Sequence, residues 1–135
     1  MVDFSLIYDT YHRIHQHLVE TPLLESSFLS NRLNKRVLIK AECLQKTGSF
    51  KYRGSWSSFV NNDIEDLKRG IISYSSGNHA QGIAAVANQL KIQATIIMPK
   101  DAPRLKIKNT LSYGANVIVY GRLKESRVAS GEWLQ

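Results

Sequence analysis

The sequence predicts an α/β fold, an open twisted parallel sheet with flanking helices. Three apolar runs of strand length carry the prediction: IISYSS from Ile71, ATIIMP from Ala94 and NVIVYG from Asn116. Segments with helical periodicity separate the runs, and a helical pattern follows the last run to the end of the chain. Strands that alternate with helices pair in parallel through right-handed crossovers, so we expect the three runs to lie in one sheet.

The segments between these runs have the apolar spacing of helices. His79–Leu90 is expected to turn five apolar side chains inward: Ile83, Ala84, Val86, Ala87 and Leu90. Ala102–Tyr113 is the second helix, with Pro103 near its first turn, where proline is tolerated. Upstream, an apolar stripe at helical spacing predicts a helix that opens near Ser49: Tyr52, Trp56, Phe59 and Val60.

The first fifty residues have a different organisation. Phe4–Leu18 follows a helical pattern, which Thr21-Pro22 ends. Ser26–Leu33 is expected to form a short helix that closes near Asn34. Val37–Glu42 alternates with period two, as a half-buried strand does.

Composition limits the classes of function. The chain has 135 residues, 43% of them hydrophobic and 21% charged, which is typical of a soluble globular protein. The formal charge is +7, and the basic residues concentrate late: Lys100, Arg104, Lys106, Lys108, Arg122, Lys124 and Arg127. They lack interleaved aromatic residues and any groove-reading motif, so we expect no nucleic-acid partner but a solvated basic face or attraction for anionic small molecules.

The location of the protein follows from the cysteine count and the N-terminus. The one cysteine excludes an intrachain disulfide, and Asp3 and Asp9 stand where a targeting signal would be basic. No stretch is long and apolar enough for a membrane span. We therefore expect a cytoplasmic protein without a membrane partner.

The loop SSGNHAQG, Ser75 to Gly82, joins the first predicted strand to a helix. In such sheets ligands bind at the carboxyl ends of the strands, and free N–H groups at a helix N-terminus suit an anion. Ser, Asn and Gly are also ordinary capping and turn residues, so the loop alone leaves both interpretations open.

A second motif, TGSFKYRG, places Lys51 at the start of a helix, where the helix dipole disfavours a positive charge. TGSFKYRG and SSGNHAQG together resemble the serine/threonine dehydratase and serine racemase branch of the fold type II pyridoxal-phosphate enzymes. TPLL at Thr21, KAECLQ and ATIIMPKDAP agree with that branch. The resemblance runs from about Thr21 to Tyr120.

The resemblance implies a role for each motif residue. Lys51 would form the internal aldimine with pyridoxal phosphate, helped by a helix N-terminus and a partly dry pocket that lower the pKa of its amine. Phe50 would pack against the cofactor ring, and Asn78 would hydrogen-bond its phenolic oxygen. The substrate carboxylate would be held by the loop: Ser75, Ser76, Gly77, Asn78 and His79.

The implied reaction is β-elimination of L-threonine or L-serine to a 2-oxo acid and ammonia, with Lys51 removing the α-proton. Ser76 keeps an alternative open. Serine racemases have serine at this position and use it to protonate the face opposite the lysine, whereas threonine dehydratases often have alanine. A racemase, or an enzyme with both activities, therefore remains an alternative.

The chain departs from the family in length. The family's glycine-rich phosphate loop lies downstream of residue 135, so we expect a truncated chain in which pyridoxal phosphate is held weakly. Residues 1–51 would be the N-terminal arm of an incomplete large domain. Residues 52–135 would be the small α/β domain, incomplete at its C-terminal end, with a tail from Gly121 that does not match the family. Exposed apolar surface would favour a homo-oligomer, with exchange of the N-terminal arm. A non-catalytic α/β remnant that binds a partner is the alternative of another class.

Other residues are assigned structural roles. His12, His15 and His17 lack the cysteine or carboxylate that would complete a metal site, so we expect none. Arg53 is expected to pair with a carboxylate, and Cys43 to be a small core hydrophobe.

Overall fold

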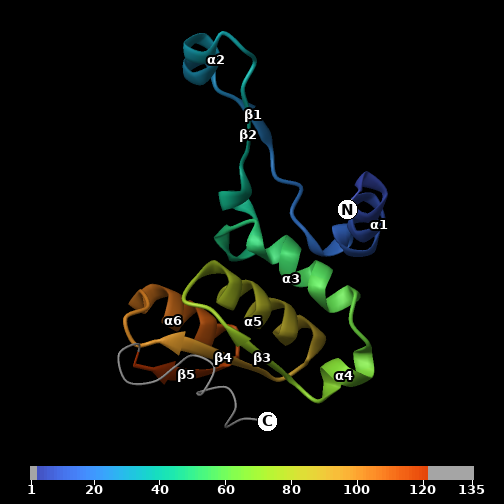
Figure 1. The fold of residues 1–135 in the computed structure, drawn as a ribbon, viewed down its shortest axis with the longest axis vertical. Coiled ribbons are helices and arrows are strands. Elements are labelled where there is room, and N and C mark those ends of the chain that lie inside the picture. Colours follow the sequence, from blue (N-terminus) through green and yellow to red (C-terminus); the bar gives the residue numbers. More distant parts are fainter. Residues whose placement is uncertain (1–2, 122–135) are drawn as a thin grey trace.

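The computed structural model describes residues 3–121, which form a sheet-and-helix body with a projecting two-stranded arm (Figure 1). The helices are α1 (Phe4–Ile14), α2 (Ser27–Leu33), α3 (Lys51–Val60), α4 (Ile64–Lys68), α5 (Asn78–Leu90) and α6 (Arg104–Ser112). The strands are β1 (Leu23–Glu25), β2 (Leu38–Lys40), β3 (Ile71–Tyr74), β4 (Ala94–Pro99) and β5 (Asn116–Tyr120). Short 3₁₀ turns occupy His15–His17, Glu42–Leu44 and Lys46–Gly48.

The parallel sheet predicted from the three apolar runs is confirmed. Its strand order is β3-β4-β5, and both pairs are parallel. Ile71 aligns with Ala94, and Thr95 aligns with Asn116. The central strand β4 is almost wholly buried, whereas β3 and β5 are half-buried at the two edges. All three strands therefore end at the same edge of the sheet, where the loop before α5 begins.

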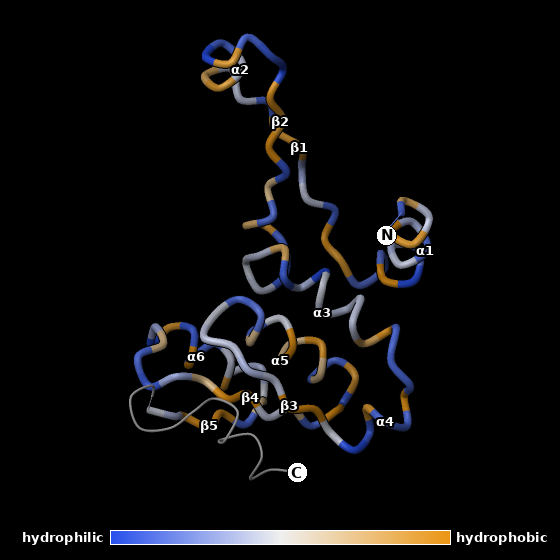
Figure 2. Tube along the Cα trace, in the orientation of Figure 1, coloured by the Kyte–Doolittle hydropathy of each residue, from blue (hydrophilic) through white to orange (hydrophobic). Residues whose placement is uncertain are grey.

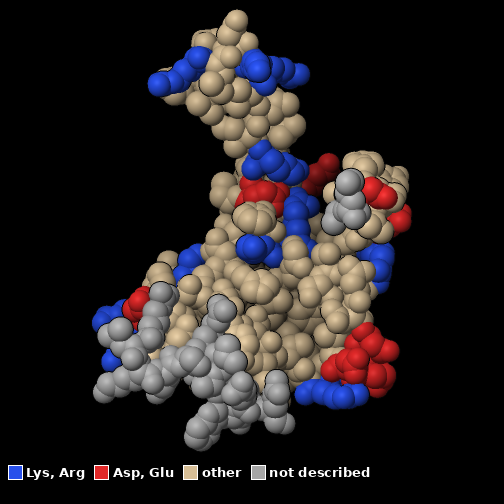
Figure 3. Space-filling view, viewed as in Figure 1, with Lys and Arg blue, Asp and Glu red and all other residues tan. Residues whose placement is uncertain are grey.

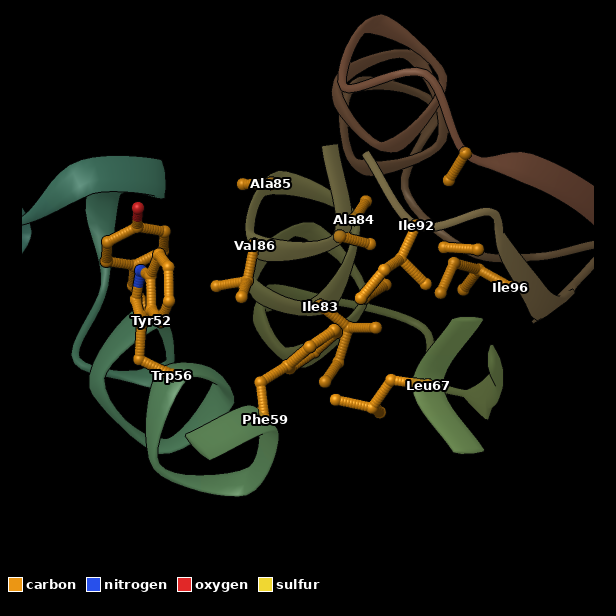
Figure 4. Packing of buried hydrophobic residues seen from close by; sticks show 14 of the residues in the cluster. Tyr52, Trp56, Phe59, Leu67, Ile83, Ala84, Ala85, Val86, Ile92 and Ile96 are labelled. Carbon is orange, nitrogen blue, oxygen red and sulfur yellow. The ribbon is translucent and has the colours of Figure 1, made fainter. Parts of the chain in front are cut away.

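The core lies between α3, α5 and the sheet. Tyr52, Trp56 and Phe59 of α3 are buried, and Figure 4 shows them pointing toward Val86 and Ile83 of α5. Burying side chains of this size stabilises the fold by about 1.5–3 kcal/mol each. The predicted apolar stripe thus fixes α3, which carries Lys51 at its start, against α5.

The arm is more exposed than the sequence predicts. β1 and β2 pair antiparallel, and α2 lies at the far end of the ribbon (Figure 1). Val37–Glu42 was expected to be a half-buried strand, but only Leu38–Lys40 is extended in a ladder and all three residues are exposed. Figure 2 shows the apolar residues along β1 and β2, and Figure 3 shows Lys and Arg side chains near α2. The expectation was wrong about burial because no described layer packs on this ribbon.

Three local expectations need correction. Leu90 is 37% exposed although it was assigned to the inward face of its helix. Cys43 is exposed, because it lies in the 3₁₀ turn after β2 and not in a core strand. The helix expected from Ala102 begins at Arg104, with Pro103 as its N-cap residue.

Several predictions lie beyond these findings. The helical pattern expected after Gly121 falls outside the described residues. The division of the chain at residue 51 stays a prediction. None of the helices between residues 3 and 121 has the length and apolar character needed to cross a bilayer.

Candidate active site

Lys51 owes its place to a tight reversal of the chain just before α3. Thr47 and Gly48 both have left-handed backbone angles, with φ of 64° and 71°. Glycine adopts this conformation at no steric cost, and the N–H of Gly48 closes the turn on the carbonyl of Gln45 at 2.8 Å. The chain then enters α3 directly at Lys51, so the predicted position at a helix N-terminus is confirmed.

The backbone of Lys51 is pressed against α5 at Gly82. A Cβ atom built on Gly82 would lie 2.5 Å from Ser55 Oγ and 3.2 Å from the carbonyl oxygen of Lys51. Ser55 is fully buried, and its hydroxyl donates to that same carbonyl at 3.0 Å. The missing side chain at Gly82 therefore lets the first turn of α3 approach the first turns of α5.

The loop Ser75–Gly77 leads from the end of β3 into α5. The Ser75 N–H donates to the carbonyl of Ile97 at 3.2 Å, which continues the sheet ladder, and the Gly77 N–H donates to Ser75 Oγ at 3.2 Å. Gly77 is the N-cap of α5. The first N–H groups of a helix have no partner within it, so this end of α5 can receive an anion.

The two motifs lie close together, with Gly82 of SSGNHAQG packed against the backbone of Lys51. The side chain of His79 interacts electrostatically with Lys51. In the loop before it, Ser75, Gly77 and Asn78 are half-buried, whereas Ser76 is exposed. Burial is the main cause that lowers the pKa of His79 below 6.5, and the positive charge of Lys51 is the second. The neutral imidazole is therefore favoured beside the amine.

The Lys51 side chain is less enclosed than expected. It is exposed, and its Nζ lies 5.2 Å from the centre of the Phe50 ring, which is itself 58% exposed. No hydrogen bond or ion pair within residues 3–121 engages this amine. The partly dry pocket expected around Lys51 is thus not formed by the described residues, although the amine is accessible to a carbonyl compound.

Sequence reasoning missed a lysine at this site. Lys106 was expected to belong to a solvated basic face or to attract anionic small molecules, but it is half-buried and its Nζ donates to Asn78 Oδ1. One turn further along α6, Asn109 Nδ2 donates to Gln81 Oε1 at 3.0 Å. The only signal in the sequence was the matching three-residue spacing on the two helices, which has no meaning until their packing is known.

A second polar cluster ties the arm to α3. Arg53 donates to both carboxylate oxygens of Glu42, at 2.8 Å each, which confirms the predicted carboxylate partner. Thr21 Oγ1 also donates to Glu42, at 2.5 Å. These bonds, the one from Arg53 foremost, lower the pKa of the Glu42 carboxyl below 4.5. The cluster holds the segment that leads into Lys51.

The histidines of the N-terminal segment are engaged in local contacts. The ring of His17 stacks on Trp56, with centres 3.8 Å apart, and His12 Nδ1 lies 2.9 Å from the carbonyl of Tyr8. Among residues 3–121 there is no group of three or more His, Cys, Asp and Glu side chains that could hold a metal ion. A groove of about 830 Å³ lies between α1 and α3; Arg53 and Gly54 at the end of TGSFKYRG line it, but Lys51 and the loop Ser75–Gly82 do not.

Comparison with known proteins decides the family. Residues 14–134 match the family described as pyridoxal-phosphate dependent enzyme. The chain belongs to this family. The match continues beyond Tyr120, where the resemblance was expected to end, and it confirms the relationship inferred from the two motifs.

Individual relatives of this pyridoxal-phosphate enzyme chain have several activities in their names. This chain is 41% identical over 128 residues to the L-threo-3-hydroxyaspartate ammonia-lyase of Saccharomyces cerevisiae, and the alignment covers 95% of this chain and 39% of that relative. It is 47% identical over 103 residues to the catabolic L-threonine dehydratase of Staphylococcus aureus, covering 76% and 30%. The crystal structure of serine racemase from Dictyostelium discoideum superposes with a TM-score of 0.90 at 32% identity, covering 98% and 43%. The chain thus spans about two fifths of the length of these proteins or less.

The residues present fit one end of the family's cofactor. An unpaired amine, an aromatic face beside it and an amide at a helix start match the carbonyl, ring and phenolic oxygen of pyridoxal phosphate: Lys51, Phe50 and Asn78. For the phosphate, residues 3–121 offer no run of glycines. The described residues therefore fit the pyridoxal ring of the cofactor.

Proposed function

We propose that this chain supplies the lysine and the substrate-binding loop of a pyridoxal-phosphate-dependent ammonia-lyase that acts on L-threonine or L-serine. The single observation that carries the proposal is the packing of the Lys51 turn against the start of α5 at Gly82. That contact joins the residue that carries the accessible amine to α5, whose first N–H groups can bind an anion, and an α-amino acid needs both groups.

Substrate binding and proton transfer are assigned to different residues of the site. The backbone at the start of α5, with Ser75 and Ser76, binds the substrate carboxylate. Lys51 takes the proton from the substrate α-carbon and holds it on Nζ. When bound, pyridoxal phosphate supplies the electron sink that accepts the charge left on that carbon.

The substrate class is β-hydroxy α-amino acids. The names of the relatives favour threonine, serine and, beyond the two substrates expected from the motifs, 3-hydroxyaspartate. All three carry a hydroxyl on the carbon next to the reacting carbon, so loss of water after proton removal is common to them.

A serine racemase is the second candidate, and the exposed hydroxyl of Ser76 favours it. A hydroxyl on the far side of the substrate could return a proton to the face opposite Lys51. The solved serine racemase that superposes on this chain supports the same alternative.

The test supplies pyridoxal phosphate and each of the three amino acids and measures 2-oxo acid, ammonia and D-serine. We expect 2-oxo acid from at least one substrate and none from Lys51→Arg, which keeps the charge but cannot form an imine. Ser76→Ala is the discriminating variant: it should abolish D-serine and retain 2-oxo acid if the racemase candidate holds. Equal rates for Lys51→Arg and the unsubstituted chain would refute the proposal.

A further inference from the structure

We propose that Lys106 is a positioning residue, which fixes the direction of the Asn78 side-chain amide so that its NH₂ group faces the cofactor. The inference rests on the function proposed above. It concerns a residue on α6, a helix that neither motif includes, and it starts from the hydrogen bond between Lys106 Nζ and Asn78 Oδ1.

The chemistry of the two side chains sets the direction. A lysine ammonium can only donate, so the Asn78 atom that faces Lys106 must be the amide oxygen. The nitrogen of the amide then points away from Lys106, and no hydrogen bond within residues 3–121 uses it. Without such a partner an asparagine amide can turn by half a rotation and offer an acceptor in place of a donor.

Asn78 lies one turn before the point where the Lys51 turn contacts α5. Asn78 and Gly82 are four residues apart on α5 and therefore share a helix face. Gly82 is the residue that the Lys51 carbonyl approaches, whereas Lys106 approaches Asn78 from α6. Because the Asn78 amide oxygen is held toward α6, we infer that its NH₂ group is left for the cofactor site at the start of α5.

A donor held in this way suits an acceptor oxygen such as the phenolic oxygen of the cofactor ring. A nearby ammonium also polarises the amide and strengthens the bond that its NH₂ group donates. Lys106 therefore acts on the cofactor through Asn78 without touching it.

The packing of α6 does not depend on this lysine alone. The hydrogen bond from Asn109 to Gln81 continues to join α6 to α5 when Lys106 is replaced. Lys106→Met preserves much of the side-chain length and the helix propensity, so the variant is expected to remain folded. Lys108→Met is the matched control, because Lys108 is an exposed residue of α6 and its replacement removes the same positive charge.

The experiment compares the unsubstituted chain with Lys106→Met, Lys106→Arg and Lys108→Met. The Asn78 side-chain NH₂ resonance is recorded by NMR in the cofactor-free chain and assigned by its loss in Asn78→Ala. Pyridoxal phosphate is then titrated, and both the absorption spectrum and the borohydride-trapped fraction at Lys51 are followed. We expect Lys106→Met to shift the NH₂ resonance, to weaken cofactor binding about tenfold and to move the absorption toward the neutral-phenol form.

The outcomes separate this inference from the proposed function. Lys106→Arg should restore affinity and spectrum, and Lys108→Met should match the unsubstituted chain. If Lys106→Met and Lys108→Met bind and absorb alike, the inference is overturned while the proposed function stands. An NH₂ resonance that is unchanged in Lys106→Met overturns the orientation of the amide by itself. Absence of labelling at Lys51 in the unsubstituted chain overturns the proposed function, and the cofactor role of Lys106 with it.

Discussion

Replacing Gly82 by alanine is the sharpest perturbation of the contact that brings Lys51 to α5. The new Cβ would lie 2.5 Å from Ser55 Oγ, about 0.9 Å closer than the 3.4 Å of ordinary contact. The hydroxyl can move only by giving up its bond to the Lys51 carbonyl, and that bond contributes about 0.5–1.5 kcal/mol. Otherwise the two helices must separate, and overpacking of this kind costs about 1–3 kcal/mol.

We expect Gly82→Ala to lower the free energy of unfolding by about 1–3 kcal/mol, measured by urea denaturation monitored by circular dichroism. Gly54→Ala is the matched control, because Gly54 is also a helical glycine, in α3, and a Cβ there meets no atom within 4 Å. Higher helix propensity should make that variant more stable by about 0.5–1 kcal/mol.

The double variant Gly82→Ala/Ser55→Ala tests the origin of the effect. Removing the Ser55 hydroxyl should recover part of the lost stability, because the contact to the Lys51 carbonyl at 3.2 Å remains. If Gly82→Ala proves as stable as Gly54→Ala, the close approach of α3 and α5 is wrong, and the placement of Lys51 is wrong with it.

Two further predictions concern pH. The pKa of the Glu42 carboxyl is lowered chiefly by its bonds to Arg53, so its contribution to stability is complete above pH 4.5 and is lost as pH falls through the lowered pKa. Glu42→Gln should therefore reduce the fall of the melting temperature at acidic pH. Replacement of an exposed carboxylate, Asp66→Asn, should leave that fall unchanged. The pKa of His79 is lowered by burial and by Lys51, so the melting temperature should decline as pH falls from 6.5 toward that lower pKa. A decline of unchanged size in His79→Gln would exclude this histidine as its cause.

The sequence predicts those parts of the fold that depend on local pattern. The alternation of apolar runs with helices predicted the parallel sheet, and the turn before Lys51 placed it at a helix start. The small and polar residues of SSGNHAQG likewise indicated a ligand-binding loop before α5, without any knowledge of distances.

What the sequence did not predict depends on packing between distant segments. The bond from Lys106 to Asn78 joins residues on separate helices, and the need for glycine at Gly82 comes from the neighbouring α3. Cys43 and the β2 strand were misjudged for the same reason. Alternation predicts a strand with one apolar face, but burial also requires a layer that covers that face.

The central claim is that Lys51 is the amine that holds the cofactor, and covalent trapping tests it most directly. The chain is incubated with pyridoxal phosphate, reduced with borohydride and mapped by peptide mass, with Lys51→Arg as the control. We predict selective modification of Lys51 over the other lysines, including Lys46 and Lys106, and no selective modification in the variant. Modification spread evenly over the lysines, or absent, would contradict the account.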